Sequence, residues 1–98
     1  MSDKATETRL ARIRLMIRGR VQGVGFRFAA CEQAKTLAVA GWVRNRPGRE
    51  VEIVAEGERK NLQMLAKWAH RGPRYAMVDE VSIEWLPFSG DFESFAVR

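Results

Sequence analysis

The apolar residues of this chain change their spacing several times, in an order that few folds can accommodate. Over residues 11–17 every second residue is apolar, which is typical of a strand with one buried face. Over residues 25–37 the spacing becomes helical, with Phe26, Ala30 and Ala34 on one side. The sequence therefore predicts a strand that is followed directly by an amphipathic helix.

The same two spacings return later in the chain. The further predicted segments are strands over residues 40–45, 51–56, 81–85 and 95–97 and a helix over residues 58–70. The turn sequence Arg46-Pro47-Gly48 joins the first two of these strands into a hairpin. In the last strand, Phe95 and Val97 are expected to face inward.

The resulting order is β-α-β-β-α-β, with a short terminal strand or strand pair. Each helix has one apolar side and each strand one apolar face, so two helices on one face of a mostly antiparallel sheet bury all of them. This arrangement is the ferredoxin-like α+β sandwich. We expect a single domain over residues 10–98, preceded by a flexible N-terminal tail over residues 1–9.

Composition and charge limit the partners. The 98 residues carry a formal net charge of +5, which favours anionic partners. The single cysteine, Cys31, rules out an intrachain disulfide and a cysteine-based metal cluster. The N-terminal residues lack the apolar segment of a signal peptide, and no apolar run is long enough to span a membrane. We therefore expect a cytoplasmic protein that does not bind membranes, and nothing demands more than a monomer.

The segment GRVQGVGFR, residues 19–27, links the first strand to the first helix. It lacks the third glycine of a dinucleotide fingerprint and the Gly-Lys-Ser/Thr of a P-loop. Glycines at such a turn nevertheless let successive N–H groups converge on an anion. Arg27 stands in the first helical turn, where a cation opposes the helix dipole by about 0.3–1 kcal/mol. A bound anion would reverse that sign, so we favour an anion site over a solvated arginine beside a tight turn.

Other candidate residues give weaker signals. Asn45 ends a strand, either as an ordinary turn residue or as a neutral amide that holds a water molecule. Arg44, Arg46 and Arg49 are close in sequence and could attract anions to that end of the sheet, although an ordinary solvated hairpin is the default interpretation. We expect His70 to be a surface or boundary residue and Cys31 to be a half-buried structural thiol. No metal site is expected. A solvated face is expected for the carboxylates Glu50, Glu52, Glu56 and Glu58.

The ordered set of segments GRVQGVGFR, GWVRN at residues 41–45, VEIVAEG at residues 51–57 and GP at residues 72–73 closely resembles the acylphosphatase family. The resemblance runs from about Arg14 to the C-terminus. Two departures are "LAVAG" at residues 37–41, where the family has Leu-Gly-Leu, and Gly48-Arg49, where its hairpin has Asp-Gly.

The resemblance implies hydrolysis of the carboxyl–phosphate bond of acyl phosphates to a carboxylate and inorganic phosphate, without a metal or cofactor. It also implies a role for Arg27 in binding phosphate and for Asn45 in positioning the attacking water. The implied phosphate-binding loop consists of Gln22, Gly23, Val24, Gly25, Phe26 and Arg27.

Two alternatives remain at this stage. A basic RNA-binding module can share the βαββαβ layout, but residues 51–57 lack the aromatic side chains on which such modules stack bases. A non-catalytic domain that only binds anions would have the same loop. Sequence patterns cannot separate this second alternative from an enzyme.

Overall fold

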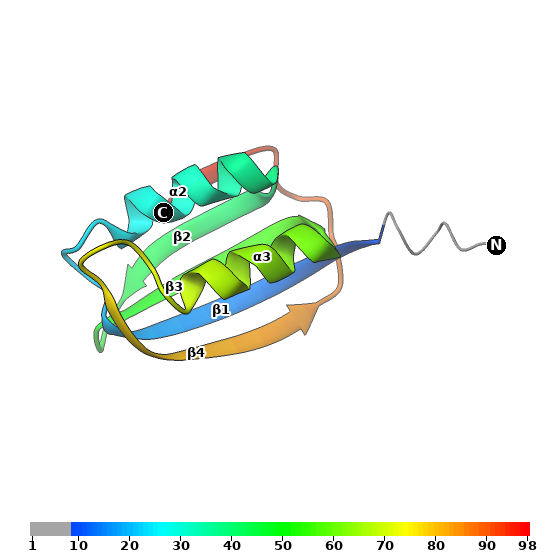
Figure 1. Ribbon diagram of the computed structural model, residues 1–98. Helices are drawn as coiled ribbons and strands as arrows, with labels where there is room; N and C mark the ends of the chain where they lie inside the picture. The colour runs from blue at the N-terminus through cyan, green and yellow to red at the C-terminus, as the bar shows by residue number, and fades with distance from the viewer. Residues whose placement is uncertain (1–8) are drawn as a thin grey trace.

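The computed structural model describes residues 9–98, so the tail expected over residues 1–9 lies outside the described residues except for Arg9. Five strands form one sheet, and two helices cover one of its faces (Figure 1). The elements in chain order are β1 (Leu10–Arg20), α2 (Phe26–Leu37), β2 (Ala40–Arg46), β3 (Glu50–Glu58), α3 (Arg59–Ala69), β4 (Met77–Leu86) and β5 (Phe95–Val97).

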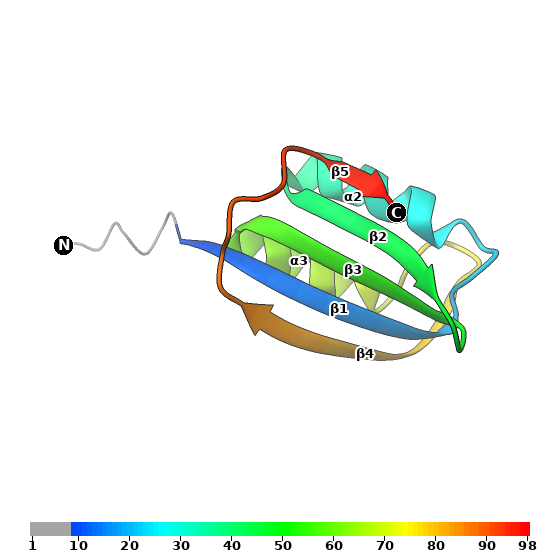
Figure 2. The ribbon, with the colours of Figure 1, turned by 180° about the vertical axis from the view of Figure 1, so that it is seen from behind.

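The sheet has the strand order β4-β1-β3-β2-β5, which can be followed in Figure 2. The β1–β3, β1–β4 and β2–β3 pairs are antiparallel, and only the short β5 runs parallel to its neighbour β2. The expected ferredoxin-like α+β sandwich with a mostly antiparallel sheet is confirmed. Within residues 9–98 the predicted strands and helices all occur, although β1 and β4 are longer than their sequence patterns indicated.

The core lies between the helices and the sheet. Helix α2 packs on β2 and β5, and α3 packs on β1 and β3. Phe26 at the start of α2 meets Trp68 of α3, with ring centroids 5.2 Å apart. Burying a side chain of this size stabilises the fold by about 1.5–3 kcal/mol. The largest other fully buried side chains are Ile13, Leu15, Ile17, Val21, Val43, Val51, Ile53, Leu62 and Leu65.

The last strand faces the core as predicted, but it is less completely buried at its end. Phe95 is partly buried and packs against the core, as expected. Val97 pairs with the buried Val43 and lies on the same face of the sheet as Phe95, so it also points inward as predicted, although it remains 50% exposed. β5 has only three residues and lies at the edge of the sheet, so it has a neighbouring strand on one side only.

The prediction of a solvated glutamate face on β3 is wrong for Glu52. The side chain does lie on the face without helices, but Glu52 is only 3% exposed. Arg14 of β1 donates to its Oε2 at 2.6 Å, and Arg44 of β2 donates to its Oε1 at 3.0 Å. Arg46 lies 3.5 Å from the same Oε1. Long arginine side chains from both neighbouring strands therefore cover this carboxylate.

Glu56 is likewise buried, at 4% exposure, and contradicts the same prediction. The loop after β4 caps it, because the Ser89 N–H and hydroxyl each donate to Oε2 at 2.8 Å and the Gly90 N–H donates to Oε1 at 3.0 Å. Arg12 of β1 adds a charged hydrogen bond at 3.3 Å. Glu50 and Glu58 are partly exposed, so the prediction holds better for them.

Candidate functional site

The loop between β1 and α2 has an unusual backbone conformation. Gly23 and Gly25 both have positive φ angles, of 76° and 81°, and Val24 between them does not. When the φ angles of successive residues alternate in sign, their N–H groups point toward one side and form an anion-binding nest. A Cβ atom added at either glycine would meet no atom within 4 Å. The backbone conformation, rather than close packing, therefore explains why glycine occupies these two positions.

Helix α2 begins beside this nest with free N–H groups. Gly25 is its N-cap, no side chain caps the helix, and the Ala29 N–H makes a hydrogen bond to the Gly25 carbonyl at 3.0 Å. The N–H groups before Ala29 therefore lack acceptors within the helix. The first turn contains no acidic residue, as the sequence indicated, and Arg27 is exposed there. Nest, helix dipole and guanidinium all favour a negative charge at this place.

Asn45 comes to the same place from β2. Its neighbours Arg44 and Arg46 make ion pairs on the open face of the sheet, and alternation along the strand places Asn45 on the helix-covered face. A hollow of about 360 Å³ is lined by Gly23, Gly25, Arg27 and Asn45 together. Residues that were singled out from two separate sequence segments thus meet in one cavity.

Not every residue of the predicted loop lines this hollow with its side chain. Gln22 turns away and donates from Nε2 to the carbonyls of Arg46 at 2.7 Å and Glu50 at 2.9 Å. Val24 packs against the core, and Phe26 is buried against Trp68. These three residues can contribute main-chain N–H groups, while their side chains fix the loop in place.

The hollow has an apolar side that the sequence reasoning missed. It is also lined by Val21, Phe26, Phe28, Cys31 and Val97. Phe28 could have been found from the helical period, because it lies off the face that carries Phe26, Ala30 and Ala34. Val97 gave no local signal, since only the parallel pairing of β5 with β2 brings it here.

Cys31 is half-buried, as expected, although its position beside the hollow was not. Burial raises the pKa of its thiol above the ordinary value of 9.0, with Lys35 lowering the pKa and Glu32 adding to the rise. The group is therefore a neutral thiol at neutral pH, which argues against a nucleophilic role.

His70 is exposed at the end of α3, and its Nδ1 lies 2.9 Å from the Ala66 carbonyl oxygen. The surface position predicted for it is confirmed. Residues 9–98 contain no group of three His, Cys, Asp or Glu side chains arranged to hold a metal ion. In the same part of the chain, no helix has the length and hydropathy needed to cross a bilayer.

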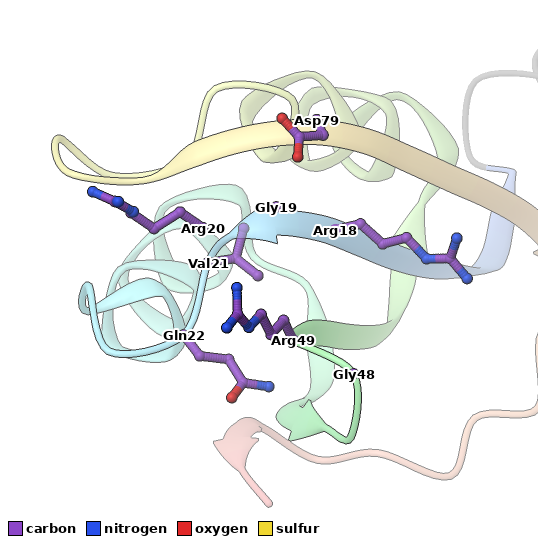
Figure 3. Close-up of a pocket in the computed structure, with 8 residues that line it drawn as sticks. All are labelled: Arg18, Gly19, Arg20, Val21, Gln22, Gly48, Arg49 and Asp79. Atoms are coloured by element: carbon purple, nitrogen blue, oxygen red, sulfur yellow. The ribbon is translucent and has the colours of Figure 1, made fainter.

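A second hollow, of about 540 Å³, lies on the other side of the loop and is lined by Arg18, Gly19, Arg20, Val21, Gln22, Gly48, Arg49 and Asp79 (Figure 3). Arg49 points from the β2–β3 turn toward Val21, whereas Arg18 and Arg20 point away from each other along β1. Arg18 is also paired with Glu50 and Glu80. The guanidinium groups do not converge, so this hollow adds a diffuse positive potential near the loop.

The ion pairs of the open face favour the default interpretation of the hairpin for two of its three arginines. Arg44 and Arg46 are engaged by Glu52 on the face opposite Asn45, so they do not lie at the hollow that Asn45 lines. Of the three arginines near the hairpin, only Arg49 lines a cavity next to the loop. The positive charge at the hollow with Asn45 comes from Arg27 and the start of α2.

The fold and the hollow define an α+β sandwich with a candidate anion-binding loop between its first strand and first helix. Comparison with known proteins narrows this class. The acylphosphatase family model matches residues 13–97. An acylphosphatase of Anaeromyxobacter dehalogenans is 46% identical over 87 residues, which are 89% of this chain and 94% of that protein. An acylphosphatase of Thermococcus kodakarensis is 49% identical over 86 residues, which are 88% of this chain and 93% of that protein.

The three-dimensional comparison agrees. The structure of an acylphosphatase from Coxiella burnetii superposes with a TM-score of 0.86 at 36% sequence identity, covering 100% of both chains. This chain belongs to the acylphosphatase family. The resemblance deduced from GRVQGVGFR and GWVRN is confirmed.

Proposed function

We propose that this chain hydrolyses the carboxyl–phosphate bond of acyl phosphates by holding the phosphate in the loop of residues 22–27 and directing a water molecule from Asn45. Acylphosphatase activity follows from membership of the family. The observation that supports the assignment of residues is the hollow shared by Gly23, Gly25, Arg27 and Asn45.

In the proposed reaction, main-chain N–H groups of the loop and the Arg27 guanidinium bind the phosphate oxygens. The Asn45 side chain offers both a donor and an acceptor, and so it can orient a water molecule toward phosphorus. The water oxygen forms a bond to phosphorus while the bond between phosphorus and the bridging oxygen breaks. The electron pair leaves with the carboxylate, and a phosphate oxygen accepts the proton of the water. The products are a carboxylate and dihydrogen phosphate.

This chemistry suits the residues near the loop. A carboxylate is a good leaving group, so the reaction does not demand a strong protein acid. Orientation and stabilisation of developing charge can supply most of the acceleration, as in other phosphoryl transfers. The positive charge of Arg27 and the start of α2 lies where that charge develops. We further propose that no metal ion takes part.

The decisive experiment measures hydrolysis of benzoyl phosphate in the presence of EDTA, with a phosphate monoester such as p-nitrophenyl phosphate as the control substrate. We expect cleavage of the first and not of the second. Loss of benzoyl phosphate hydrolysis in EDTA, restored by a divalent cation, would contradict the metal-free mechanism.

The RNA-binding alternative has little support in the structure. The open face of the sheet would be its binding surface, and on the two central strands this face carries Arg12, Arg14, Met16, Arg18, Glu50, Glu52, Val54 and Glu56. These residues include no aromatic platform for bases, and the buried carboxylates already engage arginines. A gel shift with RNA at low salt tests this alternative, and we expect none.

We also propose that residues 10–98 act as a monomeric single domain in the cytoplasm. One continuous core joins both helices to the sheet, which supports the single domain. The cytoplasmic location rests on the sequence alone, including its single cysteine. Gel filtration and cell fractionation are the corresponding measurements. The non-catalytic alternative predicts phosphate binding without turnover in the benzoyl phosphate assay.

A further inference from the structure

Two apolar side chains are exposed at the hollow that holds Arg27 and Asn45. Phe28 is 71% exposed and Val97 is 50% exposed, and both line this cavity. An isolated exposed apolar residue needs no explanation, but two large ones beside a candidate binding site indicate a surface for a ligand.

The fold places Phe28 and Val97 close to Arg27 and Asn45 in the chain and in the sheet. Phe28 follows Arg27 directly in α2, and Cys31 lies one turn further along the same helix. Val97 pairs with Val43 of β2, two residues before Asn45. The hollow thus has a polar part, formed by the glycines, Arg27 and Asn45, and an apolar part, formed by Phe28, Cys31 and Val97.

The size of the cavity suits a small ligand that has one polar part and one apolar part. Its volume of about 360 Å³ lies in the lower part of the range for small-molecule sites, about 300–1,000 Å³. A phosphoryl group on the loop leaves the remaining space to the group attached to it. In an acyl phosphate, this attached group is the acyl chain.

We propose that Phe28 and Val97 bind the acyl group of the substrate, so that the chain favours acyl phosphates with aromatic or branched aliphatic acyl groups over those with small ones. This inference rests on the proposed function, because it assumes that the phosphoryl group occupies the loop. The basic hollow on the other side of the loop does not contain Arg27 or Asn45 among its lining residues. An acyl group that extends from a phosphate between Arg27 and Asn45 therefore meets Phe28 and Val97.

The test compares kcat/KM for benzoyl phosphate and acetyl phosphate in the unchanged protein and in Phe28→Ala. We expect kcat/KM for benzoyl phosphate to fall by about 10-fold, because the variant loses the apolar contact between the Phe28 ring and the phenyl group of the substrate. The kcat/KM for acetyl phosphate should change by less than about threefold, because the acetyl group is too small to cover Phe28. Phe28→Leu keeps most of the apolar contact, so its kcat/KM for benzoyl phosphate should lie between those of the unchanged protein and Phe28→Ala. Val97→Ala should shift the ratio in the same direction.

Met64→Ala is the matched control, because Met64 is an exposed apolar side chain of α3 outside this hollow. Its ratio of the two kcat/KM values should equal that of the unchanged protein. An equal loss for both substrates in Phe28→Ala, or an unchanged ratio, overturns the acyl-binding inference while leaving acyl phosphate hydrolysis intact. An unchanged protein that cleaves neither substrate overturns the proposed function instead.

Discussion

The side-chain amide of Gln22 donates a hydrogen bond of 2.7 Å to the main-chain carbonyl of Arg46. A second bond, of 2.9 Å, reaches the carbonyl of Glu50 across the hairpin. Gln22 belongs to the loop that carries Arg27, and Arg46 directly follows Asn45. One side chain therefore ties together the two segments that meet at the candidate site.

Replacing Gln22 with Ala should lower both stability and activity. Each lost hydrogen bond costs about 1 kcal/mol, so the free energy of unfolding should fall by about 1–2 kcal/mol. We expect kcat to fall by about 10-fold because the loop is no longer fixed against Asn45. Urea denaturation and steady-state kinetics, measured where the variant is fully folded, check both effects. Gln63→Ala on the exposed face of α3 is the control, and equal behaviour of the two variants would refute a positioning role.

Arg27→Ala should lose activity and gain stability at the same time. Removing the guanidinium from the bound phosphate should lower kcat/KM for benzoyl phosphate by about 10³-fold or more, and should weaken phosphate binding. In the absence of phosphate, the variant should be more stable by about 0.3–1 kcal/mol, because a cation no longer opposes the dipole of α2. Kinetics and thermal unfolding with and without phosphate measure the two effects.

Arg27→Lys separates charge from geometry. Lysine keeps the charge but lacks the planar fork that binds two phosphate oxygens, so it should restore only part of the lost activity. Arg71→Ala, which removes an exposed arginine after α3, should change neither activity nor phosphate binding. Full activity in Arg27→Ala would show that the site is wrongly assigned.

Asn45→Ala should separate turnover from binding. The proposed role of Asn45 is to orient water, so kcat should fall by about 10²-fold or more while the inhibition constant of inorganic phosphate stays within about threefold of its original value. Asn45→Asp places a negative charge beside the phosphate and should weaken phosphate binding as well. If Asn45→Ala instead lost phosphate affinity with kcat unchanged, Asn45 would be a binding residue.

The residues that could be predicted from the sequence are those whose role follows from local physics. Alternation over residues 11–17 correctly separated the buried from the open face of β1, because a strand has only two sides. Arg27 was found because a cation stands in the first turn of a helix without any acid. Asn45 alone could be either a turn residue or an amide that holds water, and only its pairing with GRVQGVGFR in a family pattern favoured the second role.

The errors concern relationships between distant segments. Alternation placed Glu52 on the open face but could not show that Arg14, 38 positions away, covers it. The same holds for Glu56, whose partners Ser89 and Gly90 come from the loop after β4. The place of Val97 beside Asn45 depends on the pairing of β5 with β2. None of these facts has a signature within one segment.

Glu52 should make the fold sensitive to acid. Burial by itself raises the pKa of its carboxyl group. The hydrogen bonds and charges of Arg14 and Arg44 together lower the pKa by more than burial raises it, so it lies below the ordinary value of 4.5. For Glu56, burial is likewise outweighed by the hydrogen bonds of Ser89 and Gly90 and the charge of Arg12, and its pKa is lowered too. The unfolded chain therefore takes up these protons first. The stabilisation is complete above about pH 4.5 and is lost as the pH falls through the lower pKa values of the folded state.

Glu52→Gln tests this account. At pH 7 the variant should be less stable by about 1–3 kcal/mol, less than for a fully buried pair because its arginine partners are partly exposed. The difference from the unchanged protein should shrink as the pH falls through the lowered pKa of Glu52, where the native carboxylate is itself protonated. Glu84→Gln is the control, since the exposed Glu84 lies 3.6 Å from the same Arg14. If both variants had the same stability at pH 7, the buried ion pairs of Glu52 would stabilise the fold no more than the exposed ion pair of Glu84.

Arg49 strains the turn between β2 and β3 and should be replaceable with a gain in stability. Its φ angle is +63°, directly after Gly48 at +84°, and a side chain at such an angle costs about 1–2 kcal/mol. Asparagine tolerates this conformation better than arginine, so Arg49→Asn should raise the free energy of unfolding by about 0.5–1 kcal/mol. Arg74→Asn removes an exposed arginine that has no positive φ angle, and it should give no such gain in urea denaturation. Equal changes in the two variants would mean that the effect comes from charge rather than from backbone strain.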